Sequence, residues 1–276
     1  MEKNRKINDN DIKDIDVVIF DIQDVGVRFY TYLSTLHYAM ESVSRTNKKI
    51  IILDRPNPNS FYIDGPVLDI KNKSFIGLHP VPIVYGMTIG EYGKMVNGEG
   101  WLESDLKADL EVVKIKNYNH KSKYEPSIRP SPNLPNLQSI YLYPSLAFLE
   151  KTEVSVGRGT KIQFQVYGHP DFEKDFYFTP QSNFGSQNPK LKGIKSSGED
   201  LRNYKTINRI ELKWLIKSYN QFEDKNKFFR NDFDKLAGSS NLKKQIIEGI
   251  SESEIRDSWQ QGLEKFKKIR KKYLLY

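Results

Sequence analysis

The stretch that decides the fold reads Val17-Val18-Ile19-Phe20-Asp21-Ile22-Gln23-Asp24-Val25-Gly26. Its first four residues are apolar and mostly β-branched, and a polar turn follows them at once, as is typical of a buried parallel strand. Residues 27–45 repeat apolar side chains at helical spacing, and a second β-branched run covers Ile50–Leu53. This order predicts a βαβ unit with a right-handed crossover.

Further elements are predicted in the first half of the chain. We expect strands over 81–85 and 110–115, and a capping box formed by Thr88 and Glu91 that opens a helix through about residue 96. The segment 126–135 contains four prolines and is therefore expected to be extended. A domain boundary is predicted just after it.

The second half mixes strands with long helical patterns. Strands are expected over 162–167 and 176–178, and helices over 207–222 and 242–275, the last one broken near Ser251. The simplest interpretation of this order is an α+β domain.

Composition excludes several classes of site. The chain has 276 residues, which predicts about two domains at roughly 150 residues each. Cysteine is absent, which excludes disulfides, thiolate zinc sites and a cysteine nucleophile. The four histidines do not have the close spacing of a helical zinc motif, so we expect no metal site built by the protein.

The net charge is +8, from 43 basic and 35 acidic residues. Much of the excess lies in 265–272, where a solvated helix face explains it about as well as a ligand does, so we expect no nucleic-acid partner. No apolar run approaches the ~20 residues of a membrane span. Residues 1–16 are polar and lack the apolar core of a signal peptide, so we predict no signal peptide in this chain.

Polar residues gather after three of the predicted strands. In open parallel sheets, ligands bind beyond the carboxyl ends of the strands. The alternative for each cluster is that its residues cap turns and helices. The clusters are Asp21/Gln23/Asp24, Asp54/Arg55/Asn57 and Tyr85/Gly86.

A second candidate site is Gly157-Arg158-Gly159-Thr160, preceded by Glu150 and Glu153. Flanking glycines let a backbone approach a ligand while the guanidinium binds a carboxylate or phosphate. No P-loop and no GxGxxG motif is present, so nucleotide binding is not supported. Tyr30 and Tyr32 follow the first acidic turn, and two interpretations are open for them. They either pack in the core or form, together with nearby carboxylates, a face that binds a sugar.

Six ordered blocks of the sequence together match the pattern of a known family: Asp21–Tyr32, Leu53–Pro58, Tyr85–Glu91, Pro130–Pro135, Ser155–Thr160 and Arg270–Tyr276. They resemble the bacterial exo-β-N-acetylmuramidase family. The resemblance implies an α/β protein with a Rossmann-like parallel sheet over 1–140, a smaller α+β domain over 141–276 and an active site in the cleft between them. It also implies removal of terminal N-acetylmuramic acid from peptidoglycan fragments without a cofactor.

The resemblance and the motifs together suggest roles for individual residues. Glu150, Asp24 and Asp21 are the acid/base candidates. Gln23, Asn57 and Asn133 would bind hydroxyl and acetamido groups, and Tyr30 would contact the sugar. Arg28 and Arg158 would bind the lactyl carboxylate, the alternative being salt bridges to neighbouring acids. For Glu150 the alternative is a surface carboxylate, and retaining, inverting and substrate-assisted mechanisms all stay open.

The chain also departs from the family pattern. Family members carry further βα units, including a Glu-His-Gly motif with a catalytic glutamate, before the block that only residues 1–15 precede here. This predicts missing strands, self-association or a separate N-terminal segment, and near-background hydrolysis by this chain alone. The alternative function is a non-catalytic muropeptide-binding protein or an inactive fragment. Family members are often periplasmic or secreted, and localisation stays open.

A second departure is Lys151, which stands where the family shows glycine after Glu150. We expect it either to alter the turn or to pair with Glu150, which would make that residue a poorer general acid.

Overall fold

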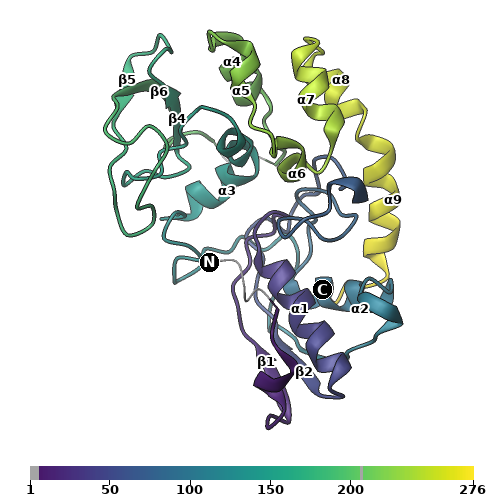
Figure 1. The fold of residues 1–276 in the computed structure, drawn as a ribbon. Coiled ribbons are helices and arrows are strands. Elements are labelled where there is room, and N and C mark those ends of the chain that lie inside the picture. The colour runs from purple at the N-terminus through teal and green to yellow at the C-terminus, as the bar shows by residue number, and fades with distance from the viewer. Residues whose placement is uncertain (1–5, 206–207) are drawn as a thin grey trace. The chain divides into compact units, whose positions relative to one another are not determined.

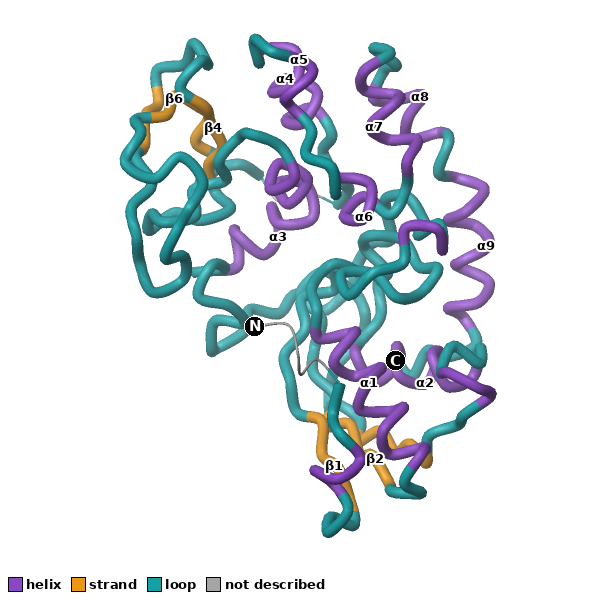
Figure 2. Tube along the Cα trace, in the orientation of Figure 1, coloured by secondary structure: helices purple, strands orange, loops and turns teal. Residues whose placement is uncertain are grey.

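The computed structural model describes residues 6–205 and 208–276, which divide into two compact units (Figures 1 and 2). The first unit comprises the chain up to Ile63, Val67–Tyr124 and Gln261–Tyr276, and the second comprises Asp64–Pro66 and Glu125–Gln260. The proline-rich segment belongs to the second unit, and the last helix belongs to the first because its Phe266 is buried in that unit's core.

The first unit contains a three-stranded parallel sheet in the order β1-β2-β3. Phe20 pairs with Ile52, and Ile52 pairs with Val112. The helix α1 connects β1 to β2, so the predicted βαβ unit is confirmed. The elements are η1 (Asp9–Ile12), β1 (Val17–Phe20), α1 (Tyr32–Arg45), β2 (Lys49–Leu53), η2 (Ile70–Asn72), α2 (Ile89–Gly98), η3 (Glu103–Asp105), β3 (Asp109–Val113) and α9 (Gln260–Lys271).

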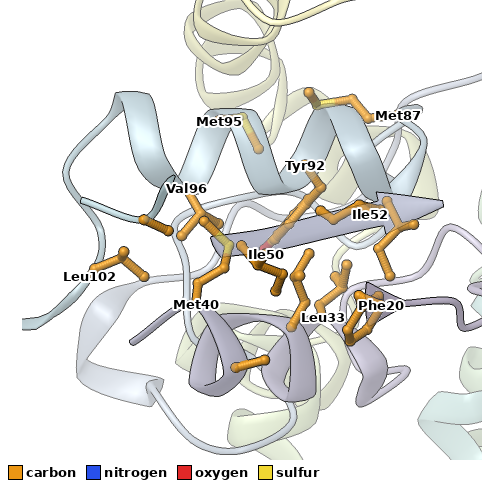
Figure 3. Packing of buried hydrophobic residues seen from close by; sticks show 14 of the residues in the cluster. Phe20, Leu33, Met40, Ile50, Ile52, Met87, Tyr92, Met95, Val96 and Leu102 are labelled. Atoms are coloured by element: carbon orange, nitrogen blue, oxygen red, sulfur yellow. The ribbon is translucent and has the colours of Figure 1, made fainter. Parts of the chain in front are cut away.

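Only one face of this sheet is packed. Ile50 and Ile52 of β2 are fully buried among side chains of α1 and α2 (Figure 3). Side chains of a strand alternate between faces, and on the other face Ile19 of β1 is 62% exposed. The expectation of a fully buried strand at residues 17–20 is therefore wrong for this face, although the parallel pairing is correct.

Two predicted boundaries in this unit are also corrected. The helix begins at Tyr32 rather than at residue 27, because Val27 forms a bridge to Val84 and the Tyr30 amide closes a turn onto the Val27 carbonyl at 2.8 Å. Residues 81–85 form no strand beyond that isolated bridge. Their apolar character reflects burial in the core, since Val81 and Tyr85 are fully buried.

The capping box of α2 is confirmed. The Glu91 amide donates to Thr88 Oγ1 at 3.3 Å, and the Thr88 amide donates to Glu91 Oε2 at 2.9 Å. These bonds satisfy backbone donors that the first turn of a helix leaves free, and the helix ends at Gly98, close to the predicted position.

The second unit is an α+β assembly with an antiparallel sheet in the order β4-β6-β5. The proline-rich segment is non-helical as predicted. Strand β4 begins four residues after the predicted start. Of the helix predicted over 207–222, only Lys213–Gln221 is helical, as α4; residues 208–212 are not helical, and residue 207 lies outside the described part of the chain. The elements are α3 (Leu137–Leu146), η4 (Ala147–Lys151), β4 (Val166–His169), β5 (Phe176–Phe178), β6 (Ser196–Asp200), α4 (Lys213–Gln221), α5 (Lys225–Phe228), α6 (Phe233–Ala237), α7 (Ser240–Ile247) and α8 (Glu252–Asp257).

The long helical pattern over 242–275 is interrupted twice. The predicted break near Ser251 is confirmed, because Gly249 has a φ of 72° after α7 and Ser251 caps α8. A second interruption separates α8 from α9. Within the described residues, no helix combines the length and the apolar character that crossing a membrane requires.

The one-sided packing of the sheet predicts unequal costs for two isoleucines on neighbouring strands. Ile52→Ala should lower the free energy of unfolding by about 2–5 kcal/mol, because it leaves a cavity in the core. Ile19→Ala should change it by no more than about 0.5–1 kcal/mol, because its side chain already faces solvent. Urea denaturation of both variants measures the difference. A cost for Ile19→Ala equal to that of Ile52→Ala would show that this face is covered in solution.

Candidate functional site

Asp24, in the turn after β1, is a buried carboxyl group with two donors on one oxygen. The Tyr85 hydroxyl and the Gly26 amide, the latter at 2.6 Å, both donate to Oδ2. Among the described residues Oδ1 has no hydrogen-bond partner, and the residue is 4% exposed. Burial raises the pKa of Asp24 to about 6, although the hydrogen bonds act in the opposite direction. Asp24 therefore exchanges a proton in mildly acidic solution.

Gln23 connects the turn after β1 to the loop after β2, and Asn57 connects that loop to the segment before α2. Asn57 Nδ2 donates to the Met87 carbonyl at 2.8 Å, and its Oδ1 accepts from the Asn59 amide at 2.8 Å. Gln23 Nε2 donates to the carbonyls of Asp24 at 2.7 Å and of Pro56 at 2.8 Å. Both amides therefore order the loops around Asp24, and their contacts with a substrate stay predictions.

Gly26 is required by this arrangement. Its φ of 76° lies in the left-handed region, and a Cβ atom there would stand 2.1 Å from Asn57 Oδ1. The close approach of the two loops thus depends on a residue without a side chain.

Asp21, the other carboxylate of the same turn, lies in a partly exposed ion pair. Arg55 Nη2 is 2.6 Å from Asp21 Oδ1, and this hydrogen-bonded partner raises the pKa of Arg55. The structure thus brings the polar clusters after β1 and β2 together with Tyr85, as the sheet-edge argument predicted, but it gives the two aspartates different surroundings.

Arg28 and Tyr30 lie further along the same segment. Arg28 is buried, its Nη1 donates to the Val81 carbonyl at 2.8 Å, and burial lowers its pKa to about 9. Tyr30 is half-buried and packs edge-on against Tyr32, with ring centroids 5.1 Å apart. Arg28 thus supports the segment around Val81, and its binding of a lactyl carboxylate stays a prediction.

Glu91, at the start of α2, is a further carboxylate, and its connection to the C-terminus was not predicted from the sequence. Glu91 Oε2 lies 2.8 Å from His120 Nε2, and its Oε1 accepts from the Leu275 amide at 2.7 Å. The capping-box pattern located Glu91, but nothing local in the sequence indicates a partner 184 positions away.

In the second unit, Glu150 and Arg158 form a bidentate ion pair. Arg158 Nη2 donates to Glu150 Oε2 at 2.7 Å, and Arg158 Nε donates to Oε1. The guanidinium also lies over the Phe164 ring, 5.1 Å from its centroid. This is the salt bridge that was the alternative to a substrate role for Arg158. The pairing of Lys151 with Glu150 is wrong, because Lys151 pairs with Asp232.

Lys190 orders the turn that carries Glu150, a role that no sequence signal indicated. Its ammonium group donates to the carbonyls of Leu149 at 3.0 Å and Val154 at 2.8 Å, and also to that of Thr152. Burial lowers the pKa of Lys190 to about 7. The backbone on both sides of Glu150 is thereby fixed.

The second unit also contains a cavity of about 590 Å³ beside Asn133. Asn133 Nδ2 donates to the Gly185 carbonyl at 2.8 Å, whereas its buried Oδ1 has no partner among the residues that the structure describes. The walls come from three segments separated in sequence, namely Arg129, Pro132 and Pro135; Thr160, Lys161 and Gln163; and Asn183, Phe184 and Gly185. The described residues contain no group of three or more histidine or carboxylate side chains placed to hold a metal ion.

Comparisons with known proteins agree along the whole chain. Residues 1–138 match the family model described as "Exo-beta-N-acetylmuramidase NamZ, N-terminal", and residues 141–276 match its C-terminal counterpart. The peptidoglycan beta-N-acetylmuramidase NamZ of Bacillus subtilis (strain 168) is 34% identical over 298 residues, which cover 99% of this chain and 70% of that protein.

Two solved structures of DUF1343 family proteins from Bacteroides fragilis have similar folds. One is 45% identical with a TM-score of 0.94, over 98% of this chain and 78% of that chain. The other is 27% identical with a TM-score of 0.86, over 100% of this chain and 79% of that chain. The α/β fold is therefore shared over essentially the entire sequence.

The raised pKa of Asp24 predicts a specific dependence of stability on pH. The folded state holds this proton up to about pH 6, whereas the unfolded chain releases it near 3.8, so the stabilisation is lost as pH rises through 6. Asp24→Asn should therefore gain stability relative to the unsubstituted protein between pH 4 and pH 7, on the order of 2 kcal/mol. Urea titrations across this range provide the measurement. The exposed Asp69→Asn is the control, and parallel profiles for Asp24→Asn and the unsubstituted chain would contradict the assignment.

Proposed function

The chain belongs to the exo-β-N-acetylmuramidase family, and from this we propose that it is a peptidoglycan glycoside hydrolase that releases terminal N-acetylmuramic acid from peptidoglycan fragments. The observation that carries the proposal is the match of both family models, in order, to residues 1–138 and 141–276. The substrate is accordingly a peptidoglycan-derived sugar, and the proposal requires no cofactor.

Asp24 is the proposed general acid. A general acid must hold a proton at the start of the reaction and release it near the working pH, and a pKa of about 6 satisfies both conditions. The Tyr85 hydroxyl stays protonated because burial raises its pKa, so it can stabilise the carboxylate that remains after proton transfer. The atom without a protein partner, Oδ1, is the proposed donor to the glycosidic oxygen.

Glu150 and Asp21 suit the step of the reaction that needs a deprotonated carboxylate. Each accepts hydrogen bonds from an arginine, Arg158 and Arg55 respectively, and a carboxylate in such a pair serves as an acceptor or nucleophile rather than as a proton donor. Both carboxylates remain candidates for this role, and the bidentate pair and the Lys190 contacts hold Glu150 in one orientation.

A second candidate function is a non-catalytic muropeptide-binding protein. The observation in its favour is the ion pairing of two of the three candidate carboxylates, Asp21 and Glu150, by neighbouring arginines. A site that only binds sugar does not need a carboxylate free to react.

Hydrolysis of a chromogenic β-N-acetylmuramide distinguishes the two functions. With Asp24 as general acid the unsubstituted chain should hydrolyse this substrate above background, unlike the near-background rate that the family pattern predicted. Asp24→Asn should lower that turnover by about 10²–10⁴-fold, the typical contribution of a general acid, while calorimetric binding of N-acetylmuramic acid is retained. Asp69→Asn, an exposed carboxylate of the same unit, should leave turnover unchanged. The Bacillus subtilis relative is the positive control.

The possible outcomes separate the assignments clearly. Full turnover by Asp24→Asn would remove Asp24 from the role of general acid. Binding of the sugar without any turnover by the unsubstituted chain would support the muropeptide-binding function instead. Loss of turnover in Glu150→Gln with an unchanged melting temperature would support the assignment of the second carboxylate.

A further inference from the structure

The cavity beside Asn133 in the second unit has two cationic side chains in its wall, Arg129 and Lys161. Other arginines of this unit lie in ion pairs, such as Arg158 with Glu150 and Arg230 with Glu153. In the described part of the chain, by contrast, no carboxylate lies within 4.0 Å of Arg129 or Lys161. Their positive charge is therefore available to an anion that enters the cavity.

The wall also presents a hydrogen-bond acceptor that the protein does not use. Gln163 is 6% exposed, and its Oε1 has no partner among the described residues. Leaving a buried polar atom without a hydrogen bond is unfavourable, so such an atom at a cavity wall indicates a donor supplied from outside the protein. The hydroxyl and acetamido N–H groups of an amino sugar are donors of this kind.

An aromatic ring completes the cavity. Phe184 is 92% exposed, although the exposure of an apolar ring to water is unfavourable. It lies in the wall together with Pro132 and Pro135, so apolar surface faces the same space as the two cations. Aromatic rings of this kind pack against the apolar face of a sugar, and about 590 Å³ is a typical volume for a small-molecule site.

We propose that this cavity is the subsite for the carboxylate-bearing part of the muramoyl group. Arg129 and Lys161 bind the carboxylate, Gln163 accepts from the sugar, and Phe184 packs against it. The inference rests on the proposed function for the identity of the sugar, and it moves carboxylate recognition from the paired Arg158 and the buried Arg28 to Arg129 and Lys161. The carboxylate belongs either to the lactyl ether of the sugar or to the attached peptide.

Calorimetric titration with three probes tests the proposal on the full chain. N-Acetylmuramic acid carries the lactyl carboxylate, N-acetylmuramoyl-L-alanine carries its carboxylate on the amino acid, and N-acetylglucosamine has none. Arg129→Gln and Lys161→Gln should each weaken binding of a carboxylate probe by about tenfold or more and change binding of N-acetylglucosamine less than twofold. Lys235→Gln, an exposed lysine of the same unit, is the charge-matched control and should change neither.

The pattern of losses identifies the source of the carboxylate. A loss with N-acetylmuramic acid assigns the cations to the lactyl group, and a loss only with N-acetylmuramoyl-L-alanine assigns them to the peptide. Unchanged binding of both carboxylate probes, or an equal loss for all three probes, would overturn the proposal. Phe184→Ala should weaken binding of all three, since the ring contacts the sugar, and equal melting temperatures confirm that the variants are folded.

These titrations do not depend on turnover. Charge-dependent binding without hydrolysis would contradict the proposed enzyme activity but support the subsite. Hydrolysis by Arg129→Gln and Lys161→Gln with unchanged affinity for the carboxylate probes would support the enzyme activity but contradict the subsite.

Discussion

The Asp54 carboxylate, at the end of β2, is the contact on which the loops of the first unit depend. Its Oδ2 accepts from the Thr88 hydroxyl at 2.6 Å and the Tyr276 hydroxyl at 2.8 Å, and its Oδ1 accepts from the Gly90 amide at 2.8 Å. One side chain thus joins the sheet, the start of α2 and the C-terminus. Gly90 is needed here, because a Cβ atom would lie 2.8 Å from the Asp54 carboxyl carbon. The loop edge that carries Asp24 is thereby ordered before any ligand binds.

Features with local causes were predictable from the sequence. The strand β2, the capping box of α2 and the break at Ser251 depend on residues within a few positions of each other. The one-sided packing of the sheet and the absence of a strand at 81–85 could not be predicted. A pattern of apolar residues shows which side chains avoid water, but it does not show which part of the chain covers them.

The candidate site shows the same division. The pairing of Glu150 with Arg158 spans eight positions and could be weighed as an alternative from the sequence. The raised pKa of Asp24 depends on its burial beside Tyr85, which lies 61 positions away in the sequence. The polar turn after β1 therefore indicated the position of this carboxyl group but not its protonation state. The cavity could not be predicted from the sequence, because its walls come from three separate segments. Asn133 was nevertheless selected, since one of those segments carries a recognisable motif.

The distribution of positive charge links the fold to the site. Buried cations here are satisfied by the protein itself: Lys190 binds backbone carbonyls, and Arg270 of α9 donates to the Gly86 carbonyl at 2.9 Å. The basic last helix, which accounts for much of the excess charge in the sequence, therefore serves partly to fasten the loop that carries Tyr85. Cations that hold the fold are thus paired within it, whereas Arg129 and Lys161 line a cavity without a carboxylate partner among the described residues. A net charge of +8 therefore does not identify a partner until the contacts of each cation are known. These contacts favour the cavity, rather than the last helix, as the place where an anion binds.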